Sequence, residues 1–143
     1  MNIVLIGFRG TGKSTVGRLL AKRLERDFID SDKHIEDSTG KTIKSIFEDD
    51  GEEGFRKIEA DVIAELSEED NKVISAGGGA VLREENVRNL KDIGFLVLLE
   101  ATPEIINSRI AQDKKTTQQR PSLTDKKPLD EIKHLIAERE PAY

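Results

Sequence analysis

The sequence predicts an α/β protein in which helices cover both faces of a central parallel sheet. Short apolar segments typical of buried strands alternate with longer segments that carry an apolar stripe at helical spacing. A glycine-rich segment joins the first predicted strand to the first predicted helix. The length of 143 residues suits a single domain, which we expect to span residues 1–143.

The first part of the chain alternates strand and helix signals. Residues 2–6 are apolar and β-branched before a glycine, which predicts a buried strand. Residues 13–26 carry an apolar stripe and are expected to form a helix. A short strand is expected at residues 28–30, and a short helix, ended by a glycine, at residues 33–38.

The middle of the chain adds helices and a third strand. Helices are expected at residues 42–49 and 52–67, and the apolar stripe of the second is expected to be buried. Residues 72–75 form the third predicted strand, which ends in the glycine triplet Gly77–Gly79. A further helix is expected at residues 83–92.

A last strand and two more helices follow. Residues 95–99 are apolar throughout, so this strand is expected to be covered on both faces. Thr102 is expected to cap a helix that runs to about Ala111, because a proline and an acidic residue follow it. Residues 112–127 are polar and lack an apolar stripe, and a loop of this length is usually either functional or disordered. Residues 128–140 return to a helical pattern.

The composition argues against several classes of protein. A net charge of −5, with both signs mixed along the chain, does not suit a broad basic surface for nucleic acid. The lack of cysteine excludes disulfides and zinc thiolates. No apolar run approaches the ~20 residues of a membrane span, and the start does not resemble a signal peptide. We expect a soluble, cytoplasmic monomer that binds a small molecule and neither nucleic acid nor membrane.

The most clearly chemical motif is the segment Gly7–Ser14, which matches G-x-x-x-x-G-K-[ST] between a predicted strand and a predicted helix. Its glycines let successive backbone N–H groups point at one anion, and the helix N-terminus adds positive potential. Lys13 is expected to reach the β- and γ-phosphates of a nucleoside triphosphate, and Ser14 to bind Mg²⁺. The expected nucleotide contacts are Gly10, Thr11, Gly12, Lys13, Ser14 and Thr15.

Two acidic residues, Asp30 and Asp32, follow the second predicted strand, at the edge where parallel sheets bind ligands. In extended chain their carboxylates point to opposite sides, so one can face magnesium and the other a substrate hydroxyl. The alternative is that Ser31 or Asp32 only caps the next helix. No Asn-Lys-x-Asp guanine signature is present, and the third strand does not end in an acid. These features favour a small-molecule kinase over a switch GTPase or an ATPase motor.

Taken together, these segments resemble shikimate kinase. The resemblance is carried by Gly7–Ser14 with Thr15, Asp30-Ser31-Asp32, the block from Gly40 to Phe47, Gly51-Glu52-x-x-Phe55-Arg56-x-x-Glu59, Gly77–Gly79, Arg120-Pro121 and Arg139-x-x-x-Tyr143. It implies a three-layer P-loop fold, similar to that of nucleoside-monophosphate kinases, around a central parallel sheet. It also implies that ATP phosphorylates the 3-hydroxyl of shikimate, giving shikimate 3-phosphate in aromatic amino-acid biosynthesis.

The resemblance further implies which residues hold the acceptor, with a substrate-binding part at about residues 31–60. The aspartate that matches Asp32 binds shikimate hydroxyls and acts as the base. Two arginines hold the shikimate carboxylate, as a planar guanidinium can with paired hydrogen bonds. From its spacing, Glu59 is expected to hold the Arg56 guanidinium in place. The implied acceptor contacts are Asp32, Arg56, Gly78, Gly79 and Arg139.

On the donor side, the resemblance implies ATP with Mg²⁺. The aspartate that matches Asp30 holds the metal through water, together with Ser14. The arginine that matches Arg109 lies against adenine, and the one that matches Arg120 reaches the phosphates from a lid, which the resemblance implies at about residues 112–127. The implied catalytic groups are Lys13, Asp32 and Arg120.

The chain stops at Tyr143, whereas members of that family usually continue into a last strand and a final helix. We expect this to open a sheet edge, to lower stability and to weaken nucleotide binding. Two rival functions stay open, a kinase for another small molecule such as gluconate and an inactive, truncated nucleotide-binding domain. Plainer roles also stay open for Arg120 as a loop charge, Arg56 as a surface ion-pair partner, and Phe47 and Phe55 as core.

Overall fold

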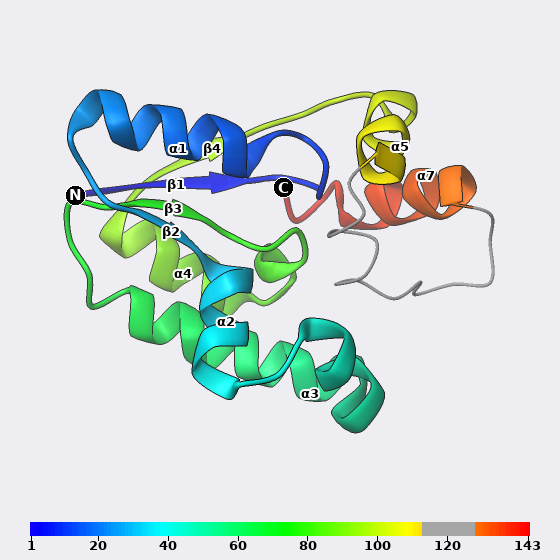
Figure 1. The fold of residues 1–143 in the computed structure, drawn as a ribbon, viewed down its shortest axis with the longest axis horizontal. Coiled ribbons are helices and arrows are strands. Elements are labelled where there is room, and N and C mark those ends of the chain that lie inside the picture. The colour runs from blue at the N-terminus through cyan, green and yellow to red at the C-terminus, as the bar shows by residue number, and fades with distance from the viewer. Residues whose placement is uncertain (113–127) are drawn as a thin grey trace.

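The computed structural model describes residues 1–112 and 128–143, and it has the expected three-layer arrangement around a parallel sheet. The strands are β1 Asn2–Ile6, β2 Phe28–Asp30, β3 Val73–Ser75 and β4 Gly94–Leu98, in the order β2-β3-β1-β4. In the register, Ile3 lies opposite Val73 on one side and Phe95 on the other. Because the strands are parallel, their carboxyl ends share the edge of the sheet at the right of Figure 1.

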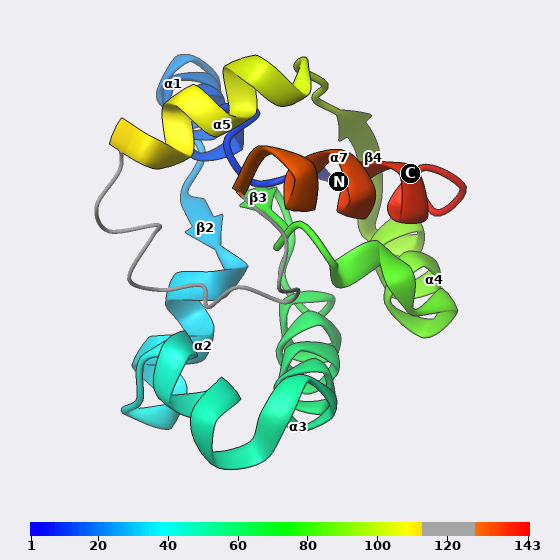
Figure 2. The ribbon, with the colours of Figure 1, turned by 90° about the vertical axis from the view of Figure 1, so that its right-hand side faces the viewer.

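Helices cover both faces of this sheet. The described helices are α1 Lys13–Leu24, α2 Ser31–Thr39, α3 Ile43–Leu66, α4 Glu84–Ile93, α5 Pro103–Gln112 and α7 Pro128–Arg139, with the short 3₁₀ helix η1 Ala80–Leu82. Helix α1 lies on one face, and α3 and α4 lie on the other (Figure 1). Helices α5 and α7 lie side by side beyond the carboxyl ends of the strands (Figures 1 and 2). Among the described helices, none is long and apolar enough to cross a membrane.

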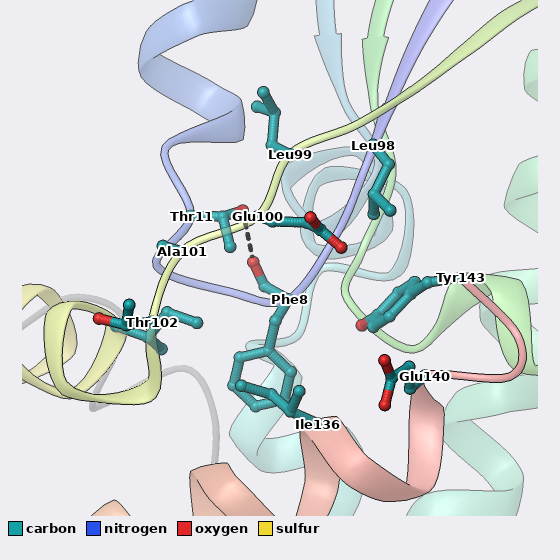
Figure 3. A pocket seen from close by; sticks show the side chains of 11 residues that line it. Phe8, Thr11, Leu98, Leu99, Glu100, Ala101, Thr102, Ile136, Glu140 and Tyr143 are labelled. Carbon is teal, nitrogen blue, oxygen red and sulfur yellow. Dashed lines mark hydrogen bonds between the residues drawn. The ribbon is translucent and has the colours of Figure 1, made fainter.

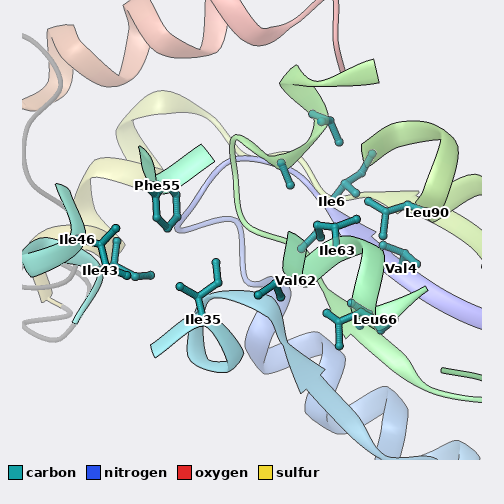
Figure 4. Close-up of a cluster of buried hydrophobic side chains, with 14 residues drawn as sticks. Val4, Ile6, Ile35, Ile43, Ile46, Phe55, Val62, Ile63, Leu66 and Leu90 are labelled. Atoms are coloured by element: carbon teal, nitrogen blue, oxygen red, sulfur yellow. The ribbon is translucent and has the colours of Figure 1, made fainter. Parts of the chain in front are cut away.

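Two apolar clusters hold these layers together. The larger one lies between the sheet and helices α3 and α4, and includes Val4, Ile63 and Leu90, all fully buried (Figure 4). The smaller one joins Phe8, in the loop after β1, to Ile106 of α5 and to α7. The first cluster therefore fixes α3 against the strands, and the second attaches α5 and α7 to the glycine-rich loop.

The structure differs from the sequence-based expectations at three places. Helices 42–49 and 52–67 form one element, but Gly51 (φ 72°, ψ −177°) breaks it at the predicted junction. Helix α2 begins earlier than expected, at Ser31, because Asp30 caps it. The expectation that the fourth strand is covered on both faces is wrong. Phe95 is 66% exposed and Val97 is 41% exposed, because β4 is an edge strand.

Candidate active site

The loop after β1 curls around an open helix N-terminus. Gly7 (φ 138°) needs to be glycine, because a Cβ there would collide with the backbone carbonyl of Leu99. Thr11 closes the curl, since its hydroxyl donates to the Phe8 carbonyl at 2.7 Å. Helix α1 starts at Lys13 after Gly12 (φ 97°), with no side-chain cap. Its first N–H groups are therefore oriented towards the loop's interior, where an anion can accept from them.

Lys13 folds back into this loop. Its side-chain ammonium donates to the carbonyls of Gly7 at 2.6 Å and Phe8 at 2.9 Å, and the residue is almost completely buried. A cation enclosed beside a helix N-terminus makes the loop strongly attractive to phosphate. A cavity of about 300 Å³ opens here, lined by Arg9, Gly10, Gly12, Lys13, Ser14, Thr15, Arg109 and Ile110. The expected nucleotide-binding residues are thus neighbours in the structure.

Arg109, expected to lie against adenine, comes from helix α5 and reaches the same cavity. Its guanidinium donates to the Gly10 carbonyl at 3.1 Å. The expected lid residue Arg120 falls outside the described residues, so its role stays a prediction.

Ser14 and Asp30 lie together where β1 and β2 end. The Ser14 hydroxyl donates to one carboxylate oxygen of Asp30 at 3.1 Å. Burial raises the pKa of the Asp30 carboxyl above its ordinary value, and the neighbouring Asp32 carboxylate raises it further. Hydrogen bonds from Lys33, Ser14 and Asp32 oppose this rise in pKa.

This pair suits a magnesium ion. Both groups offer oxygen ligands, and a divalent cation would offset the cost of the partly buried negative charge. No group of three or more His, Cys, Asp or Glu side chains that could hold a metal occurs within residues 1–112 and 128–143. A magnesium ion carried by nucleotide phosphates needs only one or two protein ligands, so the pair fits that kind of site.

The two acids are not arranged as the sequence suggested. Asp30 has extended backbone, but its side chain caps α2 by accepting from the backbone N–H groups of Asp32 at 3.0 Å and Lys33 at 3.4 Å. Asp32 lies in the first turn of the helix, so the alternation expected of an extended chain does not apply. Capping by Ser31 is also wrong, because its buried hydroxyl accepts from the backbone N–H of Gly77 at 2.9 Å.

Arg56 and Glu59 form a buried pair on α3. Their side chains meet at 2.9 Å, and they are 9% and 1% exposed. Arg56 is therefore not a surface ion-pair partner. The Glu52 carboxylate lies 3.6 Å from Nη2 of Arg56, but among the described residues no group accepts a hydrogen bond from Nε or Nη2. Since a buried guanidinium is stable only when its donors are satisfied, this edge is suited to a bound anion.

The glycine triplet brings a second arginine to the same place. A Cβ on Gly79 would lie 2.5 Å from Cζ of Arg56, so only glycine fits there. A Cβ on Gly78 would lie 3.6 Å from Nη1 of Arg139, which comes from α7. Arg139 is buried and its Cζ lies 5.4 Å from the centre of the Phe8 ring. The two arginines therefore lie close against the backbone of Gly78 and Gly79.

Sequence reasoning missed three side chains that hold this backbone in place, those of Ser31, Asn86 and Tyr143. The Asn86 side chain donates to the Ala80 carbonyl at 2.9 Å, and the Tyr143 hydroxyl donates to the Gly78 carbonyl. The sequence signals for these contacts were the Asp30-Ser31-Asp32 and Arg139-x-x-x-Tyr143 motifs, and none pointed to Asn86. Phe55 is fully buried and stacks on Phe47 with ring centres 4.8 Å apart, so the core role is correct for Phe55.

A larger cavity of about 500 Å³ lies between the loop after β1, the end of β4, α5 and the C-terminal segment (Figure 3). It is lined by Phe8, Thr11, Leu98, Leu99, Glu100, Ala101, Thr102, Ile106, Ile136, Glu140 and Tyr143. Of the expected nucleotide contacts that the structure describes, only Thr11 lines this cavity, and no described acceptor contact does. It is therefore distinct from the arginine-flanked site, although Tyr143 borders both.

Comparison with known proteins identifies the family. The family model of shikimate kinase matches residues 9–143. The shikimate kinase of Pelotomaculum thermopropionicum is 51% identical over 142 residues, which are 99% of this chain and 80% of that protein. The shikimate kinase of Symbiobacterium thermophilum is 47% identical over 143 residues, covering 100% of this chain and 81% of that protein.

Solved structures agree with the sequence comparisons. Shikimate kinase from Acinetobacter baumannii in complex with shikimate has a TM-score of 0.92 and 41% identity, covering 99% of this chain and 77% of that chain. Deoxyadenosine kinase from M. mycoides, with a TM-score of 0.55 and 13% identity, shares the fold alone. The chain belongs to the shikimate kinase family.

Proposed function

We propose that this chain transfers the γ-phosphoryl group of ATP to the 3-hydroxyl of shikimate. The observation that carries the proposal is the buried Arg56, whose Nε–Nη2 edge lies beside Gly79 without a hydrogen-bond acceptor among the described residues. Such an edge fits the carboxylate of a small acid. It lies near the same carboxyl edge of the sheet as the phosphate loop, as a phosphotransferase requires.

The donor side would be held by the loop after β1. Its backbone N–H groups and those at the N-terminus of α1 would donate to the phosphate oxygens, and Lys13 would exchange its two carbonyl partners for phosphate oxygens. Ser14 and Asp30 would hold Mg²⁺, directly or through water. The ion would neutralise charge that develops on the phosphates.

The acceptor side would position one hydroxyl for attack. Arg56 and Arg139 bind the carboxylate and so fix the orientation of the ring. The oxygen of the 3-hydroxyl attacks the γ-phosphorus, and the bond between that phosphorus and ADP breaks. Asp32, in the first turn of α2, accepts the proton that the hydroxyl loses. We also propose that the protein works as a monomer in the cytoplasm, with Arg120 delivered to the phosphates from residues 112–127.

A coupled assay of ADP release tests this function, with shikimate, gluconate or no acceptor present. We expect turnover with shikimate and Mg²⁺, and only background rates with gluconate or without acceptor. Turnover with gluconate would instead support the rival kinase. Nucleotide binding with no turnover on any acceptor would support the inactive domain.

A further inference from the structure

Side chains from three separate segments hold the backbone of the glycine triplet and of Ala80, which follows it. Ser31, at the start of α2, accepts from Gly77 N–H, and Asn86 of α4 donates to the Ala80 carbonyl. The third contact is the Tyr143 hydroxyl, which donates to the Gly78 carbonyl at 2.5 Å. These residues are distant in sequence, so the position of the triplet depends on how the segments pack.

Tyr143 reaches this carbonyl because the chain turns back after α7. The backbone N–H groups of Ala142 and Tyr143 both donate to the Arg139 carbonyl, at 2.9 and 3.2 Å. The ring packs against the larger apolar cluster and borders the cavity beside Phe8 (Figure 3). One turn therefore carries both an arginine of the acceptor site and the hydroxyl that holds Gly78.

The contact with the Gly78 carbonyl also determines where an N–H group points. In a trans peptide the carbonyl of one residue and the N–H of the next lie in one plane and point in opposite directions. No cis peptide bond occurs among the described residues. A hydroxyl that holds the Gly78 carbonyl on one side therefore directs the Gly79 N–H to the other side. Gly79 packs directly against the guanidinium of Arg56.

We propose that Tyr143 is a positioning residue of the acceptor site, which orients the Gly78–Gly79 peptide so that its N–H donates to the substrate held by Arg56. The inference rests on the proposed function, because it takes shikimate as the substrate. A hydroxyl-to-carbonyl bond is needed here because glycine backbone has more conformational freedom than any other. Without the bond, the Gly78–Gly79 peptide plane is free to rotate, and the Gly79 N–H no longer points in one fixed direction.

Tyr143→Phe tests this role, since it removes the hydroxyl and keeps the packed ring. We expect shikimate affinity in calorimetry to fall about three- to tenfold, the effect of one hydrogen bond. In kinetics, KM for shikimate should rise by a similar factor, while KM for ATP changes less than about twofold. Ser67→Ala is the matched control, because it removes an exposed hydroxyl-to-carbonyl bond outside the site and should leave both constants unchanged.

A second readout does not depend on affinity. In protein labelled with ¹⁵N-glycine, the Tyr143→Phe variant should shift or broaden the amide signals of Gly78 and Gly79, whereas those of Gly40 and Gly51 stay in place. Unchanged Gly79 signals, shikimate affinity equal to wild type, or equal losses for ATP and shikimate would each overturn the inference. A wild-type protein that binds no shikimate would instead refute the proposed function itself.

Discussion

The two halves of the site are built in different ways. The donor half is centred on one continuous segment, the loop after β1, which is closed by hydrogen bonds from Thr11 and Lys13 to its own backbone. Arg109 of α5 and Asp30 of β2 reach it from other described segments. The acceptor half is assembled from α2, α3, the glycine triplet and α7, and its hydrogen bonds join residues far apart in sequence. A local loop keeps its shape with little outside help, whereas the acceptor half depends on the packing of the whole domain.

The largest effect is expected from Lys13→Ala in the donor half. Loss of the buried ammonium removes a cation from the phosphates, and turnover should fall at least about a thousandfold. Steady-state ADP release measures it, and circular dichroism should show an unchanged fold. Lys22→Ala, an exposed position on the same helix, should behave like wild type. Activity retained by Lys13→Ala would mean that the loop is not the donor site.

The acceptor half is tested by Arg56→Lys. Lysine keeps the charge but cannot offer paired, planar donors, so shikimate should bind about a hundredfold more weakly while ATP affinity stays within about twofold. Calorimetry with each ligand measures both values, and Arg88→Lys on the exposed side of α4 is the control. Equal losses for the two ligands would place Arg56 outside the acceptor half.

The junction of the two halves is tested by Asp30→Asn. The pKa of Asp30 is higher in the folded protein than in the unfolded chain, where it is about 4. The ionised carboxylate therefore destabilises the fold, and this loss of stability develops as the pH rises from the unfolded pKa through the folded pKa. Asparagine also caps helices, so the variant should melt about 2–4 °C higher at pH 7 and equal wild type at pH 3.

The same variant should need more Mg²⁺ for half-maximal turnover, because one oxygen ligand loses its charge. Asp37→Asn on the exposed side of α2 is the control and should change neither property. An Asp30→Asn protein that melts lower at pH 7, or has an unchanged Mg²⁺ requirement, would contradict this account of the buried carboxylate.

The smallest effects are expected from two single hydroxyls, one in each half. Thr11→Ala removes a bond inside the loop and should weaken ATP about three- to tenfold, while Ser31→Ala removes the partner of Gly77 and should weaken shikimate by a similar factor. Each variant should leave the other ligand unchanged in calorimetry, and Thr11→Ser should restore ATP binding. Weaker shikimate binding in Thr11→Ala, or weaker ATP binding in Ser31→Ala, would show that the two halves are mechanically coupled.

Much of the fold follows from local signals. The boundaries of β1 and β2 agree with expectation, and the break between the two halves of α3 occurs at a glycine. The end strand β4 could not be predicted, because its apolar sequence resembles that of a covered strand while its exposure depends on its place in the sheet. The acceptor residues named by resemblance, such as Arg56 and Arg139, do meet at the glycine triplet.

The sequence alone determined the donor half of this protein, since a strand, a glycine-rich loop and a helix define a phosphate site through local backbone geometry. Only the tertiary structure decided that Asp30 caps α2, that Ser31 and Tyr143 hold the glycine triplet, and that Arg56 lies buried against Gly79 with no hydrogen-bond acceptor for Nε and Nη2 among the described residues. The physical reason is the distance along the sequence between the residues that make each contact. Hydrogen bonds within a loop follow from neighbouring residues, but a contact between Tyr143 and Gly78 exists only after the domain has packed.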